Sequence, residues 1–127
     1  MSYKYVIDSS AWFEYFTGTE SGNSLLNIIE TEPIATSIIA VAELADKFER
    51  EGISFAAHLK FIQSRAAIIS LSVELALHAA KLKKEHRPQH GKFSLADGVH
   101  LATAHQENAI LVTTDRDFSG VKNTMLV

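Results

Sequence analysis

Hydrophobic and polar residues alternate along the chain in blocks that predict strands and helices in turn. Short runs rich in β-branched residues predict strands, and apolar residues three or four positions apart predict helices. The predicted strands are residues 5–7, 33–37, 66–71, 109–113 and 124–127, the last at a sheet edge. The predicted helices are residues 11–16, 21–30, 38–48, 55–62, 72–87 and 94–107. This order predicts one α/β domain over residues 1–127, with a mostly parallel sheet and helices on both faces.

Composition excludes several functional classes without changing this fold. The 127 residues suffice for one domain, and the absence of cysteine excludes disulfides, a thiol nucleophile and a Cys-ligated metal. The chain shows no leader and no apolar run that could span a bilayer, so we expect a soluble cytoplasmic protein. The net charge of −3 argues against nucleic-acid binding, but setting aside four metal-holding acids moves the remainder to +1.

Acidic residues occur where strands end or helices begin. Asp8 follows the first strand, and Asp115 and Asp117 follow the strand at 109–113. Glu43 and Asp97 lie in the early turns of two helices. Sites in open α/β sheets form outside the carboxyl ends of the strands, which is where these positions are expected.

Asp8, Asp97 and Asp115 also have purely structural interpretations, whereas Glu43 is harder to explain in this way. Asp8 could merely cap the helix that follows it and have no functional role. Ser9 or Ser10 would also be a good N-cap for that helix. Asp97 fits a capping box in the sequence Ser94–Asp97, and Asp115 could be a turn acid. Glu43 lies in an apolar stretch, where a charge should be paired or bound to a cation.

Four blocks of sequence resemble the PIN-domain ribonucleases, and within them the VapC toxins of toxin–antitoxin pairs. The blocks are VIDSSAW at 6–12, AEL at 42–44, SLADGVHLATA at 94–104 and LVTTDRDF at 111–118. The resemblance implies a three-layer α/β/α fold and a divalent-metal-dependent endoribonuclease. It also implies that Asp8, Glu43, Asp97 and Asp115 form an acidic quartet, with Asp117 as an accessory residue.

The chain departs from this family at Gly98 and His100, where many members have alanine and an aliphatic residue. These departures remove no acid and are expected at most to alter the helix surface. The six histidines show no metal-ligand spacing, so His100 and His105 are expected to be packing or surface residues.

Carboxylates suit the chemistry that the resemblance implies, because Mg²⁺ and Mn²⁺ prefer oxygen ligands. A bound divalent ion makes water more acidic and stabilises charge on the phosphorus. We expect Asp8 to bind the metal directly, and Asp97 and Asp115 to bind it directly or through water. Glu43 could be a ligand or could orient the attacking water.

Other residues are expected to support this chemistry. Ser9 and Thr113 could orient Asp8 and Asp115 through hydrogen bonds. Several basic residues predict a patch that tracks RNA phosphates, although a solvated helix end explains most of them equally well. These residues are Lys81, Lys83, Lys84, Arg87, Lys92 and Arg116.

The expected partners are RNA, a small VapB-like antitoxin and a second copy of the chain. The dimer is predicted from candidate apolar helix faces that carry Phe48, Phe55, Leu59 and Ile62, although core burial explains many of these residues equally well. Trp12 is expected in the core.

An alternative function is a PIN nuclease of RNA maturation or decay outside a toxin pair. A phosphotransfer domain of the receiver or haloacid-dehalogenase type is disfavoured, because residues 2–7 contain no acid and Asp8 does not begin a D-x-D-x-T motif.

Overall fold

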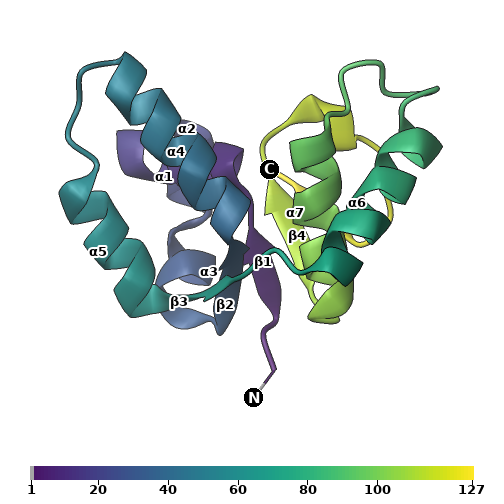
Figure 1. Ribbon diagram of the computed structural model, residues 1–127. Coiled ribbons are helices and arrows are strands. Elements are labelled where there is room, and N and C mark those ends of the chain that lie inside the picture. Colours follow the sequence, from purple (N-terminus) through teal and green to yellow (C-terminus); the bar gives the residue numbers. More distant parts are fainter. Residues whose placement is uncertain (1) are drawn as a thin grey trace.

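The computed structural model describes residues 2–127 as three layers, with a five-stranded sheet between two groups of helices (Figure 1). The strands are β1 (Tyr5–Ile7), β2 (Ile34–Ser37), β3 (Ala66–Ile69), β4 (Ile110–Thr113) and β5 (Thr124–Leu126). Their order is β3-β2-β1-β4-β5, and all four pairings are parallel, as predicted. The chain winds outward from β1 to β3 and then returns to add β4 and β5 on the other side. The β1–β4 boundary is therefore the topological switch point, where crevices open at the carboxyl ends of strands.

Helices cover both faces of the sheet. The first group is α1 (Ser9–Thr17), α2 (Glu20–Ser24), α3 (Leu26–Thr31), α4 (Ile38–Arg50) and α5 (Ala56–Arg65), and the second is α6 (Val73–His86) and α7 (Leu95–Gln106). A short 3-10 helix, η1 (Arg116–Phe118), follows β4. The single helix expected over residues 21–30 is instead two short helices, so that prediction is wrong.

Neighbouring side chains of β1 enter two separate cores, because side chains alternate across a strand. Val6 packs with α6 and α7, and Ile7 packs with Trp12 and the helices of the opposite face. Trp12 is fully buried, as expected, and its Nε1–H donates to Oγ1 of Thr36 (3.0 Å). The Thr36 hydroxyl donates in turn to the carbonyl of Ile7 (2.6 Å), which fixes α1 against the end of β1.

Core burial, the alternative to a dimer face, is correct for two of the four apolar residues. Phe48 and Ile62 are buried within the protomer, so they cannot form an exposed face. The most exposed large apolar side chains are Val73 and Leu77, which lie one turn apart on α6.

Within residues 2–127, every helix is too short or too polar to cross a membrane.

Candidate active site

Asp8 is the first residue after β1 and is almost completely buried at the carboxyl end of the sheet. Its backbone N–H donates to the carbonyl of Val112 in β4 (3.1 Å), so strand pairing fixes its position. Its Oδ1 accepts hydrogen bonds from Ala11 N (2.9 Å) and Ser10 Oγ (2.7 Å). Asp8 is therefore the N-cap of α1, and the prediction that Ser9 or Ser10 caps this helix is wrong. An aspartate accepts from the first turn of a helix as well as a serine does.

Ser10 joins the ends of β1 and β4. Its hydroxyl accepts a hydrogen bond from the backbone N–H of Thr114 (3.0 Å) and lies 3.3 Å from Oγ1 of Thr113. That threonine oxygen accepts from the backbone N–H of Asp115 (3.0 Å). The network holds the two strand ends in register, with Asp8 and Asp115 at their tips.

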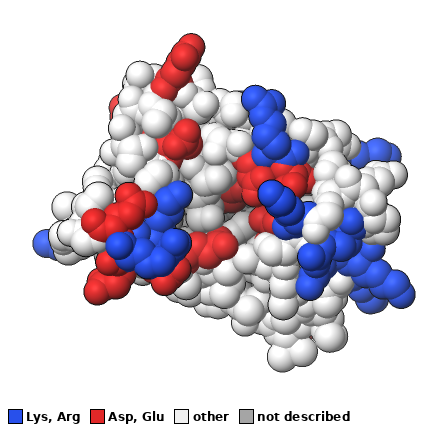
Figure 2. Space-filling model, turned by 90° about the horizontal axis from the view of Figure 1, so that it is seen from above, with Lys and Arg blue, Asp and Glu red and all other residues white. Residues whose placement is uncertain are grey.

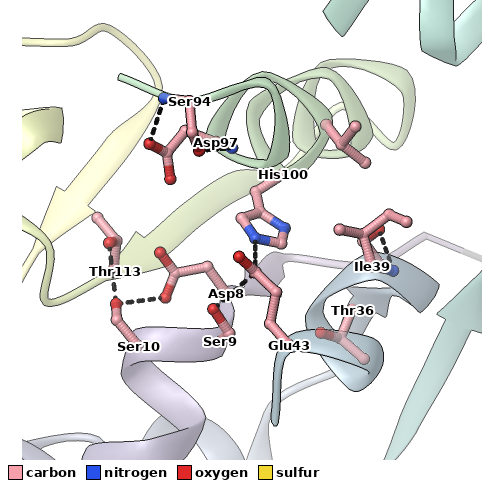
Figure 3. Close-up of polar contacts among 12 residues, drawn as sticks. Asp8, Ser9, Ser10, Thr36, Ile39, Glu43, Ser94, Asp97, His100 and Thr113 are labelled. Atoms are coloured by element: carbon pink, nitrogen blue, oxygen red, sulfur yellow. Dashed lines mark hydrogen bonds and ion pairs between the residues drawn. The ribbon is translucent and has the colours of Figure 1, made fainter. Parts of the chain in front are cut away.

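Glu43 lies in the second turn of α4 and pairs with side chains from two other helices (Figure 3). The hydroxyl of Ser9 donates to its Oε1 (2.8 Å), and Nε2 of His100 lies 2.7 Å from the same oxygen. The expectation that this carboxylate needs a partner is confirmed. Ser9, which was expected to orient Asp8, hydrogen-bonds to Glu43 instead.

Sequence reasoning missed His100, which it treated as a packing or surface residue. The side chain is 2% exposed and comes three residues after Asp97, on the same side of α7. This spacing was the signal for its place in the site, but its partner Glu43 lies 57 residues away in the chain.

Asp97, Asp115 and Asp117 each place a carboxylate oxygen within 4.8 Å of the other two. Asp97 closes a capping box at the start of α7, where its Oδ2 accepts from Ser94 N (2.8 Å). Asp115 caps η1 and accepts from the backbone N–H of Asp117 (2.9 Å). The structural interpretations of Asp97 and Asp115 are thus correct, and they are compatible with a place in the site.

The acids that follow β1 and that lie in α4 and α7 surround His100. Figure 3 shows Asp8, Glu43 and Asp97 around the imidazole, with one oxygen of Asp8 pointing toward Asp97. The negative charges of all three act on His100. Strand ends and helix starts from four parts of the chain therefore meet at one edge of the sheet.

Burial and pairing set the protonation of these groups. Burial raises the pKa of Asp8, and burial together with the charge of Asp115 raises the pKa of Asp97. Burial alone would raise the pKa of Glu43, but the hydrogen bond and charge of His100 hold it below its ordinary value. Burial alone would lower the pKa of His100, but the hydrogen bond to Glu43 and the surrounding carboxylates hold it above its ordinary value. The acids thus crowd a region where a cation would be stabilised.

The donor set fits a hard divalent cation. Asp97, Asp115 and Asp117 offer only carboxylate oxygens, the ligands that Mg²⁺ and Mn²⁺ prefer. Within residues 2–127, no other group of three acidic or histidine side chains has this spacing. Asp8 lies at the neighbouring strand end, and the hydrogen bonds that its carboxylate accepts from Ser10 and Ala11 both end on Oδ1.

Basic side chains lie on either side of the acidic centre, as Figure 2 shows. The predicted RNA-binding residues at the end of α6, in the following loop and in η1 are exposed or half-exposed, namely Lys81, Lys83, Lys84, Arg87, Lys92 and Arg116. A second basic group was not predicted. Lys47 and Arg50 of α4 line a cavity of about 350 Å³ together with Ser9, Phe13 and Glu43.

Comparison with known proteins agrees with this architecture. The family model of the PIN domain matches residues 5–123. The chain is similar to a toxin–antitoxin complex from Klebsiella pneumoniae, with 22% identity, 96% of both chains covered and a TM-score of 0.77. It is also similar to VapBC2 from Rickettsia felis bound to a promoter DNA fragment, with 25% identity, 97% of this chain and 96% of that chain covered and a TM-score of 0.70. A third similar structure is VapC20 from Mycobacterium tuberculosis, a sarcin–ricin loop cleaving toxin, with 16% identity, 94% and 95% covered and a TM-score of 0.73. No curated protein matches the chain in sequence.

Proposed function

Because the chain belongs to the PIN domain family, we propose that it is a divalent-metal-dependent endoribonuclease and the toxin of a toxin–antitoxin pair. The observation that carries the proposal is the group formed by Asp97, Asp115 and Asp117 next to the buried Asp8. A structural role alone does not require this many carboxylates at one strand edge, since crowding them costs free energy.

In this proposal Asp8, Asp97 and Asp115 hold Mg²⁺ or Mn²⁺, and Asp117, placed beside them, is a further ligand. The ion supplies Lewis acidity toward the scissile phosphate and charge stabilisation in the transition state. Thr113 holds the backbone of Asp115, and Ser10 holds the carboxylate of Asp8. These hydrogen bonds fix the orientation of the ligands before an ion binds.

Glu43 acts on the attacking water. Ser9 and His100 both contact its Oε1, and a carboxylate with a lowered pKa is ionised near neutral pH. Its Oε2 accepts a hydrogen bond from the water and so orients the water oxygen toward phosphorus. The proposed catalytic set is thus Asp8, Glu43, Asp97 and Asp115.

RNA is the proposed substrate, and the two basic groups are its phosphate contacts. The first consists of the α6, loop and η1 residues defined above, and the second of Lys47 and Arg50. A backbone that passes from one group to the other crosses the acidic centre seen in Figure 2. An RNA substrate also makes the cytoplasm the proposed compartment.

Cleavage of structured RNAs by the purified chain tests the proposal. We expect cleavage with Mg²⁺ or Mn²⁺, none with excess chelator, and none by Asp8→Asn with either ion. Metal-independent cleavage, or Asp8→Asn cleavage at the wild-type rate, would contradict the assigned site.

The toxin assignment draws on the similar structures, which include VapBC and another toxin–antitoxin complex. The proposed partner is accordingly a small VapB-like antitoxin protein. Expression of the chain should arrest bacterial growth, and co-expression of a small protein encoded beside its gene should restore it. Cleavage without growth arrest or such a neighbour would favour a nuclease of RNA maturation or decay.

A homodimer is proposed as the solution state. The exposed apolar side chains Leu71, Val73 and Leu77 lie at the sheet edge formed by β3 and at the start of α6. Light scattering at high micromolar concentration should give twice the chain mass. A monomer at that concentration would contradict the proposal.

A further inference from the structure

His100 makes a polar contact on one side only. Its Nε2 lies 2.7 Å from Oε1 of Glu43, and because a carboxylate only accepts hydrogen bonds, Nε2 carries the proton. Its Nδ1 is buried and has no hydrogen-bond partner among residues 2–127. A buried polar atom without a partner costs free energy that an aliphatic side chain would not. Packing therefore does not explain a histidine here, and its contact with Glu43 does.

Glu43 needs an external support to keep one orientation. Its side chain is long and 40% exposed, so packing alone would leave it free to turn on the surface of α4. Lys47 lies four residues later on the same helix, at the spacing that favours a Glu–Lys pair. In the structure, the Lys47 ammonium instead lies 3.8 Å from the ring centre of Phe13. Removal of the contacts on Oε1 would let Glu43 turn toward Lys47 and away from the acids.

Two donors from different helices oppose this movement. Ser9 in α1 and His100 in α7 hold the same oxygen of Glu43 from two directions. The hydroxyl of Ser9 sits on a short side chain at the edge of the cavity, whereas His100 is 2% exposed. The buried imidazole is thus the more rigid of the two supports.

We propose that His100 is a positioning residue that holds the Glu43 carboxylate in its working orientation toward the acidic centre. The inference rests on the function proposed above, in which Glu43 acts on the attacking water. The hydrogen bond of His100 goes to Glu43 and not to the carboxylates of the three-aspartate group. Its effect through Glu43 therefore falls on the turnover step, and the loss of its charge beside Asp8 and Asp97 should not weaken metal binding.

Two substitutions separate positioning from packing. His100→Leu fills the space without a donor, and His100→Gln places an amide N–H near the position of Nε2. We expect His100→Leu to lower kcat about 10- to 100-fold, as loss of an orienting partner does, with KM for RNA within about threefold of wild type and Mn²⁺ affinity no weaker than that of wild type. His100→Gln should restore most of kcat. His78→Leu, in a histidine of α6 that contacts His105 instead, is the matched control and should cleave as wild type does.

Further comparisons distinguish this proposal from a folding defect and from failure of the proposed function. In a Glu43→Gln background, His100→Leu should have little further effect on kcat, since the group it orients is gone. The ¹³C resonance of the Glu43 carboxyl group should move in His100→Leu and return toward its wild-type position in His100→Gln. This resonance reports positioning even if the wild-type chain cleaves no RNA, an outcome that would overturn the proposed function alone. Any of three results would overturn the positioning role. His100→Leu could keep the wild-type kcat, or both His100 variants could lose kcat equally. The third is that His100→Leu lowers kcat as much in the Glu43→Gln background as in the wild type.

Discussion

Gly98 of α7 lies directly against the backbone of Ala79 in α6, so close that a Cβ at position 98 would overlap the Ala79 carbonyl oxygen. The contact brings the two helices together where α7 carries Asp97 and His100. Gly98 is one of the two positions at which the chain departs from the PIN family, and it was expected to alter only the helix surface. It is buried instead, and it sets how near α7, with Asp97 and His100, lies to α6.

Gly98→Ala should destabilise the protein. The added methyl group meets backbone, which cannot move aside as a flexible side chain could. Overpacking of this kind costs about 1–3 kcal/mol. The higher helix propensity of alanine returns at most about 1 kcal/mol, so we expect a net loss and a melting temperature several degrees lower. Thermal unfolding followed by circular dichroism measures the change.

Gly91→Ala is the control for this substitution. No atom lies within 4 Å of a Cβ built at Gly91, so its free energy of unfolding should change by no more than about 0.5 kcal/mol. If Gly98→Ala were as stable as Gly91→Ala, the close contact between α6 and α7 would be wrong.

The sequence predicted the fold well where local patterns and topology agree. The apolar runs gave all five strands, and parallel order placed Asp8 and Asp115 at neighbouring strand ends. The division of residues 21–30 into two helices was not predictable in this way. It accompanies a close approach of Gly22 to the backbone of Glu14 in α1, which only the packed structure reveals.

The site was predictable to the same extent and for the same reason. Acids that follow strands can be located from topology, but hydrogen bonds between side chains of different helices cannot. Ser9 and Ser10 are adjacent in sequence, yet one donates to Glu43 and the other to Asp8. Their roles depend on the direction of each hydroxyl at the start of α1, which has no counterpart in the residue pattern.

Asp8→Asn should lose RNA cleavage by more than about 100-fold, since loss of orienting partners alone costs about 10- to 100-fold. The fold should survive, because asparagine has nearly the same size and is an equally good N-cap for α1. Initial rates with Mn²⁺, beside circular dichroism spectra of both proteins, check the two halves of this expectation. Lost activity with an altered spectrum would show an unfolded variant rather than a missing ligand.

Asp117→Asn tests whether the third carboxylate of the cluster binds metal. With free Mn²⁺ at about 100 times its dissociation constant, the wild-type protein should gain roughly 2.7 kcal/mol of stability. The variant should gain clearly less at the same concentration, because one of three neighbouring carboxylates has lost its charge. Asp46→Asn, an exposed acid of α4 paired with Arg50, should leave the gain unchanged.

The measurement is the shift in melting temperature on adding Mn²⁺ relative to NaCl at matched ionic strength, since screening is not coordination. Equal shifts for Asp117→Asn and the wild type would return Asp117 to the accessory role that its sequence position suggested. The absence of any Mn²⁺-specific shift in the wild type would remove the main physical support for the metal site.

The burial of Asp8 predicts a pH dependence of stability in the metal-free protein. Burial raises the folded-state pKa of Asp8 above its unfolded value, so the ionised carboxylate destabilises the fold. Both states are protonated at low pH and the group then contributes nothing. As pH rises through the unfolded pKa, the unfolded chain releases its proton first and stability falls, until the loss levels off above the folded pKa.

Asp8→Asn lacks this group but keeps Glu43, Asp97 and His100, so its stability advantage over the wild type should grow with pH and then become constant. Urea unfolding of both proteins in chelator, from about pH 4 to about pH 8, measures that difference. A stability advantage that is constant or shrinks across the range would show that burial does not raise the pKa of Asp8 in the folded protein.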